Sequence, residues 1–295
     1  MIDTRLKVFC SVARNLSFTK ASRELHISQP AISKHIHELE NEYNVALFER
    51  LGTRIELTHA GELLLSHAEK IIDNYRSLNF EMNLLSEQHV GELRLGASTT
   101  IAQYVLPPFL ASFAQKFRQI KVSLLNGNTQ EIEHAIDEHR IDLGLVEGRS
   151  NQPHLHYIPF MKDELVLVVN AQSKLAALDE ITLDELKEMP LVIRENGSGS
   201  LEVLKHKLSE HNIRLSDLNV IMQLGSTESI KLFIESTECA GIISIQAIAR
   251  DLYAGKFKII EITDFCCERS FSFVQHIGQN AGIVRDFMRY VTQNF

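Results

Sequence analysis

The chain has 295 residues, 44% of them hydrophobic, which is enough for more than one domain with its own core. The four cysteines are too irregularly spaced for a disulfide framework. No secretory signal or membrane-length apolar stretch is visible, so a cytoplasmic protein is expected. The net charge is −8, although residues 1–60 hold eight Lys and Arg against seven Asp and Glu, so nucleic-acid binding there would depend on where the cations stand.

The first 43 residues predict three helices. The first spans residues 5–14, with Leu6, Phe9, Val12 and Ala13 facing inward. Ser17 and Ser28 stand where N-caps are needed for two further helices, and Pro30 falls in the first turn of the second, where a missing N–H does no harm. This last helix buries Ile32, Ile36 and Leu39. Its opposite side carries Gln29, Pro30, Ser33, Lys34 and His37.

A helix that displays amide, hydroxyl and ammonium groups opposite a buried stripe is equipped to enter a DNA major groove. The alternative is a solvated face on an ordinary helical hairpin, and the helix pair alone favours neither. Residues 50–57 then predict a small hairpin that turns at Gly52-Thr53, with Arg50 and Arg54 along the DNA backbone or in the minor groove. Phosphate contacts are expected from Lys20, Arg23, Lys34, Arg50 and Arg54.

Thr58 is a candidate N-cap for a long helix that runs to about residue 88. Its apolar residues follow alternating intervals of four and three, which is a heptad pattern, at Leu64, Ala68, Ile71, Tyr75, Leu78, Met82 and Leu85. Such a stripe implies a partner helix. The alternative is packing against the later part of the same chain.

From about residue 90 strands and helices alternate, which predicts a parallel sheet flanked by helices. The expected strands are 92–97, 121–125, 141–146, 164–169, 191–193, 220–223, 241–244 and 269–274. The expected helices are one from 98 to about 118 that bends at Pro107-Pro108, one capped by Asn128 or Thr129, one from Thr182 with a Glu185 capping box, two from near Ser198 and Thr227, and one over 281–290. The chain is expected to cross into a second unit near residues 160–162.

Two runs of hydroxyl residues point to a ligand site between these units. Residues 98–100 and 196–200 each follow a strand and open a helix, where free N–H groups and the helix dipole favour anions. Each hydroxyl could instead cap its own helix, but both runs together favour a small carboxylate, sulfate-like or phosphate ligand. Glu147 and Glu195 would oppose an anion there unless Arg194 or Arg149 offsets them.

Enzyme chemistry finds little support. Residues 96–100 end in Thr where a nucleophile elbow needs Gly, and no phosphate-binding or dinucleotide-binding glycine pattern is complete. No catalytic residues, metal site or cofactor are therefore expected. The vicinal pair Cys266-Cys267 leaves a redox switch as a minor alternative.

The N-terminal run resembles the winged helix-turn-helix of LysR-type transcriptional regulators. The matching residues are Phe9 and Ala13, Ser-Phe-Thr at 17–19 with Ala21, Leu-His-Ile-Ser-Gln-Pro-Ala-Ile-Ser at 25–33, Ile36 with Leu39-Glu40, Leu-Phe-Glu-Arg at 47–50 and Leu-Thr-His-Ala-Gly-Glu at 57–62. The resemblance implies a DNA-binding domain over 1–58, a dimerisation helix over 59–89 and an effector domain over 90–295. The effector domain would be two-lobed and similar to periplasmic binding proteins, with lobe I at about 90–161 and 267–295 and lobe II at about 162–266.

The resemblance implies a DNA-binding regulator modulated by a small anion held between the lobes. Residues 96–100, 146–148 and 194–199 look most like regulators of sulfur or carbon assimilation. DNA contacts are expected from Thr19, Lys20, Gln29, Pro30, Ser33, Lys34, His37, Arg50 and Arg54. Effector contacts are expected from Ser98, Thr99, Thr100, Gln103, Thr129, Ser198, Gly199, Ser200 and Thr227. The expected partners are an interrupted DNA palindrome, a second copy in a homodimer or homotetramer, and RNA polymerase as a further candidate. The alternative is a cytoplasmic small-molecule-binding protein or transferase with no specific DNA target.

Overall fold

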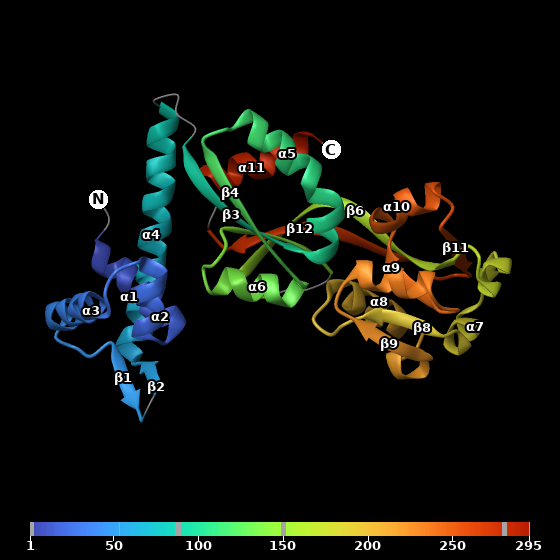
Figure 1. Ribbon diagram of the computed structural model, residues 1–295, viewed down its shortest axis with the longest axis horizontal. Helices are drawn as coiled ribbons and strands as arrows, with labels where there is room; N and C mark the ends of the chain where they lie inside the picture. Colours follow the sequence, from blue (N-terminus) through green and yellow to red (C-terminus); the bar gives the residue numbers. More distant parts are fainter. Residues whose placement is uncertain (1–2, 53, 86–89, 149–151, 279–281, 295) are drawn as a thin grey trace. The chain divides into compact units, whose positions relative to one another are not determined.

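The computed structural model describes residues 3–52, 54–85, 90–148, 152–278 and 282–294, apart from the side chains of Arg50, Leu51 and Leu84 (Figure 1). It divides into two compact units, residues 1–90 and residues 91–295. Among the described helices, none combines the length and the apolar character that crossing a membrane requires.

The first unit contains the helix-turn-helix and the hairpin that the sequence predicts. Its elements are α1 (Thr4–Asn15), α2 (Phe18–Leu25), α3 (Gln29–Tyr43), β1 (Phe48–Leu51), β2 (Arg54–Leu57) and α4 (His59–Leu85). Ser17 Oγ accepts from the N–H of Lys20, and Ser28 Oγ accepts from the N–H of Ala31, which confirms both caps. The hairpin pairs Leu51 with Arg54 and turns through Gly52, while the predicted second turn residue, Thr53, lies outside the described residues.

The helix α4 begins where predicted, because Thr58 Oγ1 accepts from the N–H of Gly61. Its heptad stripe does not face a single partner. Leu64 and Ala68 pack into the core of the first unit beside Phe9, Ile36 and other residues of α1 and α3. The later stripe residues Ile71, Leu78, Met82 and Leu85 are exposed. The prediction of one seam along the whole helix is therefore wrong for its first two positions, and the predicted end of the helix near residue 88 lies outside the described residues.

The second unit is built on one mixed sheet with strand order β4-β3-β5-β12-β6-β10-β8-β9, and β11 pairs with both β6 and β7. The strands are β3 (Gly91–Ser98), β4 (Ile120–Gly127), β5 (Leu143–Glu147), β6 (Leu155–Asn170), β7 (Glu180–Ile181), β8 (Leu191–Arg194), β9 (Val220–Leu224), β10 (Ala240–Ser244), β11 (Phe257–Ile262) and β12 (Cys267–His276). The expected parallel sheet is only partly right. β3 is parallel to β4 and β5, and β8 to β9 and β10, but every pairing of β6 and β12 with these strands or with each other is antiparallel.

The long strands β6 and β12 run through both halves of this unit (Figure 1). Lobe I denotes the half around β3–β5, with the π-helical segment η1 (Ile101–Val105) and the helices α5 (Leu106–Lys116), α6 (Thr129–Asp137) and α11 (Gly282–Gln293). Lobe II denotes the half around β7–β11, with η2 (Lys174–Ala177), η3 (Leu215–Asp217) and the helices α7 (Leu183–Glu188), α8 (Gly199–Glu210), α9 (Thr227–Glu235) and α10 (Ile245–Tyr253). The predicted interruption of the 98–118 helix is confirmed, since η1 precedes Pro107 and Pro108.

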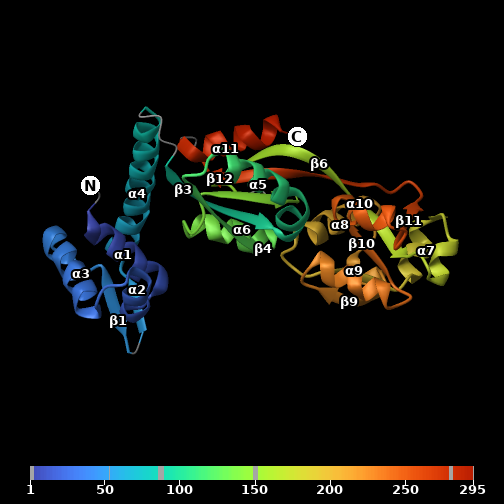
Figure 2. The ribbon, with the colours of Figure 1, turned by 45° about the horizontal axis from the view of Figure 1, so that its top comes forward.

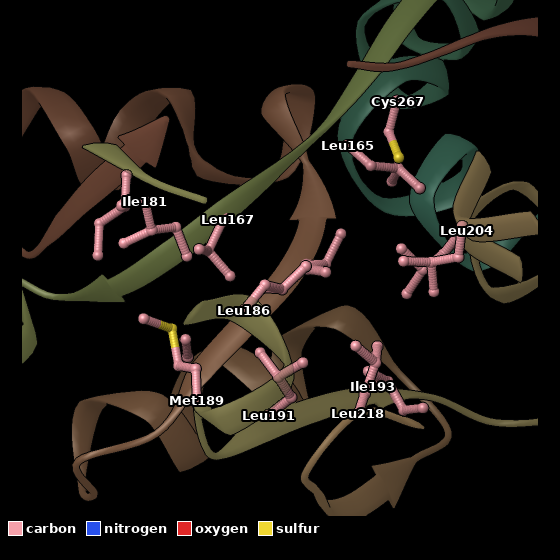
Figure 3. Packing of buried hydrophobic residues seen from close by; sticks show 14 of the residues in the cluster. Leu165, Leu167, Ile181, Leu186, Met189, Leu191, Ile193, Leu204, Leu218 and Cys267 are labelled. Atoms are coloured by element: carbon pink, nitrogen blue, oxygen red, sulfur yellow. The ribbon is translucent and has the colours of Figure 1, made fainter. Parts of the chain in front are cut away.

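Helices cover both faces of the sheet in each lobe. In lobe I, α6 packs on one face through Ile132 and Ile136, while α5 and α11 meet on the other through Phe113 and Phe287 (Figure 2). In lobe II, α7 and α8 bury the cluster shown in Figure 3, where Leu165 and Leu167 of β6 lie near Leu186 and Leu204. The helices α9 and α10 bury a separate cluster on the opposite face. The strands β7 and β11 and the helix α10 are elements that the sequence reading did not predict.

A small histidine cluster in lobe I makes stability depend on pH. The rings of His139 and His276 stack with centroids 4.7 Å apart, and His276 Nε2 donates to the carbonyl of Ile136 at 3.0 Å. Burial, with the neighbouring His139 ring adding to it, lowers the pKa of His276 below its ordinary value of 6.5. The unfolded chain therefore binds more protons than the folded chain as the pH falls below 6.5, so the free energy of unfolding falls with it.

We predict that His276→Phe reduces the loss of thermal stability between pH 7.5 and pH 5.5, because the replacement keeps an aromatic ring but removes the proton site. The melting temperature of the second unit, residues 91–295, measured across this range, checks the prediction. The same replacement at exposed His156 is the control and should leave the pH dependence unchanged. An equal pH dependence in the His276 variant and the unaltered protein would contradict the account.

Candidate functional site

The helix α3 has one face in the core and one in solvent. Ile32, Ile36 and Leu39 are buried with residues of α1 and α2, as the sequence predicts. The turn before the helix is tight because His26 adopts the left-handed conformation and its N–H donates to the carbonyl of Ser22. The predicted polar face therefore lies on the outside of the unit.

The predicted DNA-binding side chains are accessible where the structure describes them. Gln29 and Pro30 are exposed, Ser33 is half-buried, and the side chains of Lys34 and His37 are 75% and 76% exposed. Lys34 lies 3.8 Å from Glu38, which is a weak surface pair that a phosphate or a base edge can replace. Thr19, Lys20 and Arg54 are also exposed, and the side chain of Arg50 lies outside the described residues.

Buried polar side chains converge between lobe I and lobe II. Ser98, the last residue of β3, donates from Oγ to Oε2 of Glu147, the last residue of β5. Thr100 donates to the other carboxylate oxygen of Glu147 at 3.5 Å. Thr129, the first residue of α6, donates to the carbonyl oxygen of Glu147 at 2.9 Å. Three of the hydroxyls predicted as effector ligands thus meet at one glutamate.

The positive charge of this region comes from Arg269 on β12. Its Nε lies 2.7 Å from Oδ2 of Asp163, its direct neighbour on β6, and the two side chains are 1% and 0% exposed. Its Nη1 donates to Ser200 Oγ at 2.8 Å and lies 3.8 Å from Oε1 of Glu147. Ser244 donates to the second oxygen of Asp163 at 2.7 Å. We call Ser98, Thr100, Thr129, Glu147, Asp163, Ser200, Ser244 and Arg269 the interlobe cluster.

The first turn of α8 lies directly against lobe I. A Cβ added at Gly199 would be 2.0 Å from the carbonyl oxygen of Glu147 and 2.6 Å from Thr129 Oγ1, so only glycine fits there. The N–H of Gln130 donates to the carbonyl of Gly197 at 3.2 Å. In the described part of the chain, two buried polar atoms at this junction have no hydrogen-bond partner, Ser198 Oγ and Arg269 Nη2. Both can bind a ligand without breaking an existing bond.

The other predicted effector residues are placed elsewhere. Thr99 Oγ1 donates to the carbonyl of Gly127, and Gln103 is exposed, with no hydrogen bond to the interlobe cluster within the described residues. Thr227 accepts from Arg194 Nη1 at 3.4 Å. The guanidinium of Arg194 is also paired with Glu195, so it offsets that carboxylate as the sequence reading allowed, while the cation beside Glu147 is Arg269. Arg149, the other cation considered, lies outside the described residues.

Sequence reasoning missed Arg269, Asp163 and Ser244. A signal was present, because Arg269 shares one face of β12 with Cys267, Phe271 and Phe273, all of which are buried. A charge at a buried position of a strand requires an opposite charge beside it. Asp163 occupies the same kind of position on β6, but only the strand register shows that the two side chains are neighbours.

A second contact joins the lobes near η1. The hydroxyl of Tyr104 donates to Glu228 of α9, and Lys231 Nζ lies 5.3 Å above the Tyr104 ring. Burial, with the neighbouring Glu228 carboxylate adding to it, raises the pKa of Tyr104 and keeps its hydroxyl protonated. Lys231 also pairs with Asp251 of α10 at 2.6 Å, so this contact links lobe I to two helices of lobe II.

The cysteines are poorly suited to redox sensing. Burial raises the pKa of Cys267 to about 12, and both burial and a contact with Glu164 raise that of the exposed Cys266. The thiolate is the reactive form, so raised pKa values disfavour reaction with an oxidant. Burial of Cys267 and the contact of Cys266 with Glu164 therefore argue against the minor alternative of a redox switch at this pair.

Both parts of the chain match models of known protein families. Residues 4–62 match the model of the bacterial regulatory helix-turn-helix protein, lysR family, and residues 86–295 match that of the LysR substrate binding domain. The chain belongs to the LysR family of transcriptional regulators. It is a DNA-binding regulator with an effector-binding domain, and the predicted family and two-part architecture are confirmed, whereas the enzyme alternative is not supported.

Three known proteins are similar to this LysR-family chain in sequence or in structure. The HTH-type transcriptional regulator CysL of Bacillus subtilis is 32% identical, over 91% of this chain and 89% of CysL. The regulatory domain of Synechocystis CcmR in complex with 2-PG (2-phosphoglycolate) matches with a TM-score of 0.62 and 26% identity, over 69% of this chain and 96% of that domain. Full-length CbnR complexed with its target DNA has a TM-score of 0.62 and 19% identity, over 100% of both chains, and shows the shared fold.

We predict that Arg269→Met destabilises the second unit by about 3–5 kcal/mol, because it leaves the buried carboxylates of Asp163 and Glu147 without a cation. Denaturant unfolding of the full chain, monitored through the unfolding of the second unit, measures the change in its free energy of unfolding. Lys205→Met removes an exposed pair with Glu202 and serves as the control, for which little change is expected. Equal stability of the two variants would show that the ion pair of Arg269 is not a determinant of the fold.

Proposed function

We propose that the regulator reads DNA through the exposed face of α3 and responds to a small anion bound at the interlobe cluster. The convergence of Ser98, Thr100 and Arg269 on one buried point is the observation that carries the effector proposal. Hydroxyls and a guanidinium are the donors that oxyanions prefer in proteins. The unpartnered Ser198 Oγ and Arg269 Nη2 provide further donors at the same junction. The binding of 2-PG by CcmR supports an anionic ligand.

The DNA part of the proposal rests on α3 and the hairpin. Gln29, Ser33 and Lys34 present an amide, a hydroxyl and an ammonium group on one exposed face, which suits base edges in a major groove. Lys20 and Arg54 lie outside that face and suit phosphate contacts. The complex of CbnR with its target DNA supports this mode of binding.

We also propose a homodimer formed through α4. Ile71, Leu78, Met82 and Leu85 form an exposed apolar stripe on one side of this helix, and a second copy would bury it. Two α3 helices would then face two halves of an interrupted palindrome. This proposal also includes the pairing of dimers into tetramers, contact with RNA polymerase and a cytoplasmic location. It further includes the domain boundaries at residues 58 and 89.

We predict that Lys34→Ala, combined with Ser33→Ala, weakens binding to the specific DNA site at least about tenfold, because a good contact with a base edge contributes roughly 1–3 kcal/mol. Fluorescence anisotropy with the labelled promoter fragment at fixed salt measures the affinity. Lys70→Ala, which removes an exposed lysine from α4, is the control and should bind as the unaltered protein does. Specific binding at full affinity by the double variant would refute the role of α3.

We predict that Thr100→Val abolishes the thermal stabilisation caused by the effector, while specific DNA binding is kept. The replacement preserves the shape of the buried side chain but removes a donor from the interlobe cluster. A thermal-shift titration of the full chain with sulfate, phosphate and 2-phosphoglycolate measures the response. Thr99→Val is a matched control, since the Thr99 hydroxyl contacts Gly127 instead. An unchanged shift in Thr100→Val, or its loss in Thr99→Val alone, would remove Thr100 from the site.

A further inference from the structure

The donors assigned above to the effector already hold an anion that belongs to the chain. The carboxylate of Glu147 accepts from Ser98 Oγ and from Thr100 Oγ1, and one of its oxygens lies 3.8 Å from Arg269 Nη1. The residue is 2% exposed, so water does not compete for these contacts. Glu147 thus occupies the position that the proposed function gives to an acidic group of the effector.

The charges of the region make simultaneous binding unfavourable. The interlobe cluster contains the two carboxylates of Glu147 and Asp163 and the single guanidinium of Arg269. Asp163 holds Arg269 Nε at 2.7 Å and also accepts from Ser244, whereas Glu147 has only the longer contact of 3.8 Å with the guanidinium. An added anion would be a third negative charge beside one buried cation. Glu147 contacts Arg269 less closely than Asp163 does, so the Glu147 carboxylate is the one that an added anion can replace.

We propose that Glu147 is a built-in competitor of the effector, which binds by replacing the Glu147 carboxylate on Ser98, Thr100 and Arg269. This inference rests on the proposed function, because it takes the interlobe cluster as the effector site. It also narrows the ligand class. A carboxylate offers two oxygens, and Glu147 leaves Ser198 Oγ and Arg269 Nη2 unpartnered in the described part of the chain. A tetrahedral oxyanion such as sulfate or a phosphate monoester has enough oxygens to engage these donors as well.

The backbone of Glu147 connects this exchange to lobe II. Its carbonyl oxygen accepts from Thr129 and lies against Gly199, and Arg269 Nη1 joins the same region to Ser200. Glu147, α6 and the first turn of α8 are therefore in mutual contact. Arg269 Nη1 lies beside both the Glu147 carboxylate and Ser200 of α8, so an anion that replaces this carboxylate bears on a contact of α8, which gives the effector a physical route to alter how the lobes meet.

The test is a calorimetric titration of the full chain with sulfate, inorganic phosphate and acetate. Glu147→Gln keeps the shape of the side chain and removes the competing charge, so sulfate and phosphate should bind about tenfold more tightly or better. In the unaltered protein, both tetrahedral ions should bind more tightly than acetate. Glu195→Gln is the matched control, because Glu195 pairs with Arg194 outside the interlobe cluster, and its affinities should match those of the unaltered protein.

Each outcome decides between the two proposals. If sulfate or phosphate binds the unaltered protein and Glu147→Gln binds it equally or more weakly, Glu147 is not a competitor, and the proposed effector site survives. If none of the three ions binds either protein, both proposals fall. Should Glu147→Gln fail to fold, as judged by circular dichroism, Glu147→Asp takes its place. The shorter side chain retracts the carboxylate from Ser98 and should also tighten oxyanion binding, and unchanged or weaker binding would overturn the inference.

Discussion

A guanidinium with almost no access to water lies between two carboxylates where β6 and β12 pass from one lobe to the other. Arg269 and Asp163 are direct neighbours across these antiparallel strands, and both side chains point into the junction rather than into solvent. Neither charge could be buried alone. Their pairing fixes the register of the two strands that both lobes share, and with it the positions of β5 and the first turn of α8. The hydroxyls of the candidate effector site depend on that frame.

The two units differ in where they place their polar side chains. In the first, α3 buries its aliphatic face and leaves its polar face to solvent, where it is free to exchange water for DNA. In the second, polar groups are buried and already partnered, mostly with one another. An anion at the proposed effector site would therefore compete with most of these internal hydrogen bonds, whereas DNA at the proposed α3 face would compete mainly with water.

Local patterns predicted the first unit well. Ser17, Ser28 and Thr58 cap helices because their hydroxyls satisfy N–H groups only a few residues away, and such contacts can be read from sequence alone. The capping box at Thr182 was predicted for the same reason, and of the two candidates Asn128 and Thr129 the structure has Asn128 as the cap. The predicted heptad stripe was only partly right, because periodicity shows which residues share a face but does not distinguish a partner helix from the core that received Leu64 and Ala68.

Contacts between residues far apart in the sequence could not be predicted in the same way. The hydroxyl runs at Ser98 and Ser198 were found because helix starts are local, but Arg269 and Asp163 are separated by more than a hundred residues and meet only through strand register. The two crossings between the lobes were expected, but the pairing of β6 with β12 was not, so their antiparallel course was missed. The most direct test of the account is a crystal structure of the protein grown with sulfate or a phosphate monoester. The account predicts the anion on Ser98, Thr100 and Arg269 with the Glu147 carboxylate turned away, and an anion bound elsewhere with Glu147 still on Ser98 would contradict it.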